Sequence, residues 1–176
     1  MNNTEVIDVL REVYRQRLAV SNNLCCYLGG AVESCKDWGK MWRSLYKEYL
    51  TGHNIYAIDP IEMEGILASK RGLSTQELHA LKETNPHLFN IHMRTVIAVD
   101  LALVEEADFL LVRFDGEPTA GTIHEVGHAY RLGIPCYLIT GLERKNILSW
   151  FLACFDGVFH SLEVAIPIIE MEFGSV

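Results

Sequence analysis

The chain has 176 residues, 49% of them hydrophobic, so it can bury one sizeable core, and nothing in it marks a second domain. Its formal net charge of −8 argues against a nucleic-acid polymer as partner, because no basic stripe offsets the negative field. No apolar run is long enough to span a bilayer, and the first residues lack a signal pattern. We therefore expect one cytoplasmic domain over residues 1–176 with no membrane partner.

The first part of the chain predicts a helix, a strand, a helix and a second strand. Residues 4–20 have the apolar spacing of an amphipathic N-terminal helix within residues 1–20. Residues 24–28 form a buried-strand run that Gly29 and Gly30 end, and a helical spacing follows in Trp38, Trp42, Leu45 and Tyr49. Residues 54–58 predict the second strand, and Asp59-Pro60 predicts a turn after it. This order predicts a right-handed parallel crossover.

The pattern loosens over residues 62–90, where we expect an insertion that acts as a lid or an interface. Within it, Ser74-x-x-Glu77 is a capping box that predicts a short helix through Lys82. Further helices are predicted at 91–107, 122–130, 145–155 and 162–173, and strands at 108–113, 135–139 and 158–159. Five parallel strands with helices on both faces predict an α/β, flavodoxin-like doubly wound sheet.

The segment after the central strand is the main candidate site, because ligands of such sheets bind at the carboxyl ends of the strands. We expect Glu125 in the first turn of the next helix, where the helix dipole and backbone amides would keep it ionised. Asp100 or Asp115, if desolvated beside it, would have a raised pKa and could deliver a proton. An ionised nucleophile and a proton donor suit glycosyl transfer through a covalent sugar intermediate.

Each of these carboxylates also has a structural interpretation. Asp115-Gly116 is a common turn pair, Glu125 complements a helix dipole, and Asp100 would lie on the exposed side of its helix. The spacing of His124 and His128 is not that of zinc proteases, so we interpret them as pocket or interface residues. A cationic stretch on one predicted helix is interpreted as a solvated face: Lys36, Lys40, Arg43 and Lys47.

These residues resemble those of the nucleoside 2-deoxyribosyltransferases and the related 2′-deoxynucleoside 5′-monophosphate N-glycosidases, over roughly residues 24–160. The most specific likeness is Asp115-Gly116…Gly121-Thr122-x-x-Glu125-x-Gly127-x-Ala129, which is similar to the family signature Asp-Gly…Gly-Thr-x-x-Glu-x-Gly-x-Ala. Tyr27-Leu28-Gly29-Gly30 resembles the first strand of the family with its substrate-contacting tyrosine, and Asp100 resembles an aspartate on the helix before the central strand.

The resemblance implies that Glu125 is the nucleophile on the sugar C1′, that Asp100 and Asp115 bind or protonate the substrate, and that Tyr27 helps to hold them. It implies further substrate-binding residues: Gly29, Gly30, Gly116, Gly121, Thr122 and His124. The substrates would be a nucleoside or nucleotide and a free nucleobase. The resemblance implies neither a metal nor an organic cofactor, and it implies a homodimer or a higher homo-oligomer.

Three functions follow as hypotheses. The first is a nucleoside 2-deoxyribosyltransferase that forms a covalent deoxyribosyl-Glu125 intermediate and passes the sugar to another base. The second is an N-glycoside hydrolase of deoxynucleosides or their 5′-monophosphates, in which water is the acceptor. The third is a non-catalytic protein that binds or senses a nucleotide. Because Glu33 follows the first strand and would repel a phosphate, unphosphorylated nucleosides are favoured.

Overall fold

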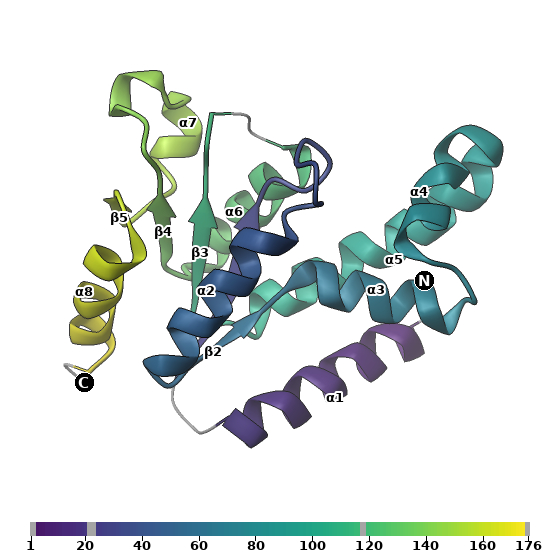
Figure 1. Ribbon diagram of the computed structural model, residues 1–176, viewed down its shortest axis with the longest axis horizontal. Coiled ribbons are helices and arrows are strands. Elements are labelled where there is room, and N and C mark those ends of the chain that lie inside the picture. Colours follow the sequence, from purple (N-terminus) through teal and green to yellow (C-terminus); the bar gives the residue numbers. More distant parts are fainter. Residues whose placement is uncertain (1–2, 21–23, 117–118, 175–176) are drawn as a thin grey trace.

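One parallel sheet organises the chain in the computed structural model, which describes residues 3–20, 24–116 and 119–174. The order of its five strands is β2-β1-β3-β4-β5 (Figure 1). The strands are β1 (Leu24–Gly30), β2 (Ile55–Ile58), β3 (Phe109–Arg113), β4 (Cys136–Ile139) and β5 (Gly157–Phe159). This order and the parallel pairing confirm the predicted flavodoxin-like α/β fold.

Helices cover both faces of the sheet, which is why its central strands are apolar throughout. One face packs against α2 (Lys40–Gly52) and α8 (Leu162–Gly174) through Leu28 and Leu111. The other face carries Leu110 and Val112, and the remaining α-helices lie on that side, with α4 packed on α3 and α5. These helices are α1 (Asn3–Val20), α3 (Pro60–Lys70), α4 (Thr75–Thr84), α5 (Pro86–Glu105), α6 (Ala120–Leu132) and α7 (Ser149–Leu152).

The prediction of a turn at Asp59-Pro60 is wrong, because these two residues begin α3. The side chain of Asp59 accepts a hydrogen bond from the backbone N–H of Ile61 at 2.9 Å, and Pro60 occupies the first position of the helix. Proline suits that position because its missing N–H would have no partner there.

Residues 62–90 are mostly helical. The predicted capping box between Ser74 and Glu77 does start α4, and α5 begins earlier than predicted, at Pro86.

The helix predicted over residues 145–155 is also wrong. That stretch contains a short 3-10 helix, η1 (Arg144–Asn146), and the four-residue α7.

Among the described residues, α5 is the one helix that is long and apolar enough to cross a membrane by length and composition alone. In this structure α5 packs on α1, α4 and α6 and buries Val96, Val99 and Leu103.

Candidate active site

Glu125 is anchored to the first strand by a hydrogen bond. Tyr27 of β1 is fully buried, and its hydroxyl donates to Oε1 of Glu125 at 2.6 Å. Because α6 begins at Ala120, Glu125 lies in the second turn of the helix and not in the first. Burial raises the pKa of Glu125, while the Tyr27 hydrogen bond and the positive charge of Arg43 oppose this shift. The prediction that the helix N-terminus holds Glu125 ionised is therefore wrong, and Tyr27 and Arg43 favour the anion instead.

Asp100 of α5 lines the same cavity as Glu125. Burial raises the pKa of Asp100 well above its usual value, and the negative charges of Glu125 and Glu64 raise it further. Two desolvated carboxyl groups in one cavity do not both ionise readily, so one of them retains a proton. Since Tyr27 and Arg43 stabilise the Glu125 carboxylate, we assign that proton to Asp100. Burial and the neighbouring negative charges thus favour the protonated form of Asp100, while Tyr27 and Arg43 favour the anion of Glu125.

A cavity of about 440 Å³ contains these groups at the carboxyl end of β1. It lies where the strand order reverses between β1 and β3, which is the usual ligand position in doubly wound sheets. Its volume is within the range of small-molecule pockets, roughly 300–1,000 Å³. Apolar and small residues complete the lining beside the charged groups: Gly30, Val32, Ser34, Pro60, Ile61, Met93, Val96, Thr119, Ala120, Gly121 and Thr122.

Arg43 is the buried cation of the site, with 1% of its surface exposed. Its Nη2 donates to the backbone oxygen of Gly30 at 3.0 Å, and its Nη1 donates to that of Gly39 at 3.2 Å. Its Nε lies 3.5 Å from Oδ1 of Asp59, and its guanidinium stacks 4.2 Å from the centroid of the Trp42 ring. The interpretation of this residue as part of a solvated face is wrong. A helical charge pattern alone does not distinguish an arginine that points inward from one that points to water.

The loop between β1 and α2 closes around Arg43 and needs glycine to do so. Gly39 has a φ of 68°, and a β-carbon there would lie 2.4 Å from Nη1 of Arg43. Gly30 has a φ of 153°, and a β-carbon there would lie 2.8 Å from Cζ2 of Trp42. A side chain at either position would displace the loop or the arginine. The glycines therefore permit a cation to sit beneath the two carboxyl groups.

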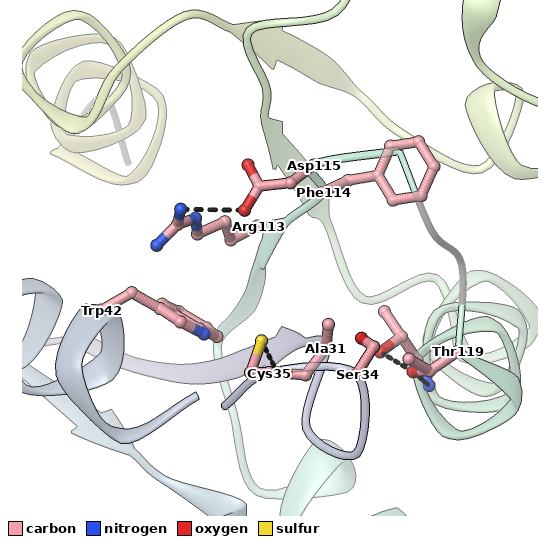
Figure 2. Close-up of a pocket in the computed structure, with 9 residues that line it drawn as sticks. Ala31, Ser34, Cys35, Trp42, Arg113, Phe114, Asp115 and Thr119 are labelled. Atoms are coloured by element: carbon pink, nitrogen blue, oxygen red, sulfur yellow. Dashed lines mark hydrogen bonds and ion pairs between the residues drawn. The ribbon is translucent and has the colours of Figure 1, made fainter. Parts of the chain in front are cut away.

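Asp115 lies apart from Asp100 and Glu125. It lines a neighbouring cavity of about 280 Å³, where its side chain is 65% exposed and pairs with Nη2 of Arg113 at 2.8 Å. Figure 2 shows Asp115 and Arg113 together on one side of this cavity and Ser34 and Thr119 on another. Ser34, Thr119 and Thr122 line both cavities, so the two cavities adjoin at the start of α6. The structure thus brings together two of the three predicted carboxylates.

Some of the other predicted site residues line the Glu125 cavity, and others do not. Gly30, Gly121 and Thr122 line the Glu125 cavity, and Gly29 lies against it, since a β-carbon there would be 3.7 Å from Oε2 of Glu125. Gly116 and His124 are exposed and line neither cavity. The neighbouring His128 contacts Oε1 of Glu105 at 2.9 Å. Within the described ranges, no group of three or more His, Cys, Asp or Glu side chains could hold a metal ion.

Three residues of the cavity were not assigned a place in it by sequence reasoning: Glu64 of α3, His79 of α4 and the buried Arg43. The capping box at Ser74 fixes the start of α4, and the apolar Leu78 identifies the buried side of that helix. His79 directly follows Leu78, so a position for His79 near the cavity could have been predicted from the sequence. No comparable signal pointed to Glu64, because the sequence predicted a turn at Asp59-Pro60 and an insertion after it, and not the helix α3.

No protein-family model matches the sequence, and no curated protein matches it. Among solved structures, the chain is similar to the 2-deoxyribosyltransferase of the psychrotolerant bacterium Bacillus psychrosaccharolyticus, with a TM-score of 0.58 and 19% identity. The match covers 80% of this chain and 89% of that one. The chain has the fold of this 2-deoxyribosyltransferase. A conserved protein from Enterococcus faecalis V583 is also similar, with a TM-score of 0.52, 18% identity, and coverage of 82% of this chain and 95% of that one. At these identities the likeness establishes the fold, and the argument for function rests on the site.

Proposed function

We propose that the protein is a nucleoside 2-deoxyribosyltransferase, a pentosyltransferase that moves 2-deoxyribose from one nucleobase to another. The observation that carries the proposal is that Asp100 and Glu125 line one cavity at the β1/β3 edge, with Glu125 held from behind by the buried Tyr27. This arrangement supplies an oriented carboxylate and a protonated acid side by side, as a double displacement at a sugar carbon requires. The 2-deoxyribosyltransferase fold adds support.

In the proposed reaction, Oε2 of Glu125 attacks C1′ while the C1′–N bond to the base breaks. Tyr27 holds the other oxygen of Glu125, and no described residue donates to Oε2, so this oxygen is available for attack. As the ester forms, Glu125 loses its negative charge, which lowers the pKa of the adjacent Asp100. Asp100 then gives its proton to the departing base. A second base attacks C1′, returns a proton to Asp100 and releases Glu125, so the configuration at C1′ is retained.

The charges around the cavity favour an unphosphorylated 2′-deoxynucleoside over a nucleotide. The carboxylates of Glu33, Glu64 and Glu125 line it, and they would repel a 5′-phosphate. Arg43 does not compensate, because its two terminal nitrogens donate to backbone oxygens. The double displacement uses protein side chains alone, so the proposal includes no metal or organic cofactor. We also propose a homo-oligomer that acts in the cytoplasm.

The wild-type reaction tests this proposal directly. Purified protein is incubated with each 2′-deoxynucleoside and each deoxynucleoside 5′-monophosphate, with and without a second free base, and the products are separated by chromatography. We expect a new deoxynucleoside whenever a second base is present. Free base without exchange would instead support an N-glycoside hydrolase, and ligand binding without turnover would support a sensing protein. Turnover of monophosphates alone would contradict the proposed substrate class.

Asp100→Asn is expected to stabilise the protein and to impair catalysis. The folded-state pKa of Asp100 lies above its unfolded value, so ionisation weakens folding as pH rises from the unfolded pKa through the folded one. Asparagine carries no such charge and should raise the free energy of unfolding by about 1–2 kcal/mol at pH 8 and by less at pH 4. Loss of the proton donor should lower kcat by about 100-fold or more.

Thermal unfolding at both pH values and the exchange assay at neutral pH measure these two effects. Asp8→Asn on α1 is the matched control, because Asp8 forms only exposed ion pairs with Arg11 and Lys70. An Asp100→Asn protein that is less stable than wild type at pH 8 would show that Asp100 is ionised and paired in the folded state.

A further inference from the structure

The wall of the cavity formed by α3 and α4 carries an oriented pair of opposite charges. His79 of α4 lines the cavity, and its Nε2 lies 3.1 Å from Oε1 of the buried Glu64 on α3. Its other ring nitrogen, Nδ1, lies 3.8 Å from Oε1 of Glu33, which is beyond hydrogen-bond distance. The Trp38 ring packs against the imidazole with 4.8 Å between centroids and limits its rotation. One nitrogen is therefore anchored while the other stands beside a second carboxylate.

Charged groups on the neighbouring segments affect the pKa of His79. The hydrogen bond to Glu64 is the largest cause that raises its pKa, and the charge of Glu33 adds to it. Burial of the ring and the charge of Lys82 act in the opposite direction. Lys82 also holds the second oxygen of Glu33, with its Nζ 4.0 Å from Oε2. Because its two ring nitrogens face the carboxylates of Glu64 and Glu33, the geometry favours the protonated ring, which has an N–H donor at Nδ1 beside the acceptor oxygens of Glu33.

This pair can recognise one arrangement of polar atoms on a nucleobase. Adenine and cytosine carry an acceptor ring nitrogen next to an exocyclic amino group, which complements a donor next to an acceptor. Hypoxanthine and uracil carry a ring N–H next to a carbonyl oxygen on the same edge. When His79 faces the ring nitrogen and Glu33 faces the exocyclic group, these oxo bases oppose donor to donor and acceptor to acceptor, whereas the reversed placement would favour them; the proposal is for the first placement. A polar group left unpaired in a binding site strongly reduces the rate for the wrong substrate.

We propose that His79 and Glu33 select nucleobases that carry an amino group beside an acceptor ring nitrogen, as adenine and cytosine do, with Glu64 as the positioning residue for His79. The proposal rests on the proposed function, since it assumes that the sugar lies at Asp100 and Glu125. The base then extends toward α3 and α4. A purely structural link between the two helices would require only the His79–Glu64 contact and would not affect the choice of base.

A competition assay separates these possibilities. One deoxynucleoside donor is supplied with equal concentrations of adenine and hypoxanthine, and the ratio of the two products is measured; cytosine and uracil form a second pair. We expect the wild type to favour the amino base by at least about 10-fold. Glu33→Gln and His79→Gln should reduce this ratio toward one, because an amide can both donate and accept. The ratio does not depend on how much active enzyme is present, so a variant that folds poorly still reports it.

Glu83→Gln and His87→Gln are the matched controls, since both residues are exposed and lie outside the cavity lining. They should keep the wild-type ratio. A wild-type ratio near one, or a ratio that neither cavity variant changes, would overturn the proposal. If the protein transfers no sugar at all, calorimetry with 2′-deoxyadenosine and 2′-deoxyinosine tests recognition alone. Tighter binding of 2′-deoxyadenosine would then support selection of the amino base although the proposed transfer had failed, and equal affinities would overturn both.

Discussion

Glu125→Ala is expected to abolish the formation of new deoxynucleosides, with a loss of at least about 10⁴-fold in kcat, because it removes the proposed nucleophile. Tyr27 orients this carboxylate at 2.6 Å, whereas Asp100 in the same cavity is assigned the role of proton donor. The measurement is chromatographic exchange at neutral pH. Mass spectrometry of the wild type, quenched during turnover without an acceptor base, should reveal one added deoxyribosyl group, and the variant should show none.

The fold should survive this substitution, since it removes a buried charge whose pKa is raised by its surroundings. An unchanged or higher melting temperature for Glu125→Ala would therefore attribute the loss of activity to chemistry. Glu48→Ala on α2 is the matched control, because Glu48 is exposed and lies outside the site. Exchange by Glu125→Ala within about 10-fold of the wild-type rate would rule out Glu125 as the nucleophile.

Arg43→Met is expected to destabilise the protein by about 3–5 kcal/mol, because it leaves a buried partner charge without compensation. Asp59 would lose the cation 3.5 Å away, and the backbone oxygens of Gly30 and Gly39 would lose their donors. The loop that forms one wall of the cavity would then be held less firmly. Chemical denaturation at pH 7 measures the loss. Arg94→Met on the exposed side of α5 is the control, for which we expect a change below about 0.5 kcal/mol.

Arg43 should also affect the pH profile of catalysis. The folded-state pKa of Glu125 lies above its ordinary value, so its carboxylate is lost as pH falls through that pKa, and Arg43 opposes the shift. Removing the cation should move the acidic limb of kcat/KM to higher pH. If Arg43→Met does not fold, Arg43→Lys retains the charge while losing the fork of donors, and it should keep the wild-type limb at reduced stability. If the acidic limb of kcat/KM lies at the same pH in Arg43→Met as in the wild type, the charge of Arg43 does not affect the pKa of Glu125.

The residues proposed for sugar transfer and those proposed for selecting the base lie on different elements of the fold. Glu125 and Asp100 lie on the two helices that flank β3, and the anion of Glu125 is held by Tyr27 of β1. Glu64 and His79 lie on α3 and α4, which extend beside the sheet (Figure 1). In such folds the sheet supports the general chemistry while the peripheral segments vary. Changes at His79 in α4 would therefore alter substrate choice, whereas changes at Glu64 in α3 would also affect the pKa of Asp100.

Much of the fold followed from local sequence patterns. The apolar runs before Gly29 and before Asp115 predicted β1 and β3, since strands buried on both faces require continuous apolar residues. The alternation of strands and helices then predicted the parallel sheet, because parallel neighbours need a crossover. Asp59-Pro60 shows the limit of this approach: an aspartate before a proline can end a strand or cap a helix, and the packing of α3 against the sheet selects the helix.

The sequence by itself determined that Glu125, Asp100 and Tyr27 belong to elements that meet at one edge of a parallel sheet, because strand order and helix spacing fix that edge. Only the tertiary structure decided which groups face one another there. It placed Asp115 beside Arg113 in an adjoining cavity, turned Arg43 inward to line the same cavity as Glu125, and added His79 from α4. The physical reason is that burial and charge depend on three-dimensional distance. A carboxyl group acquires its pKa from neighbours that lie far away along the chain.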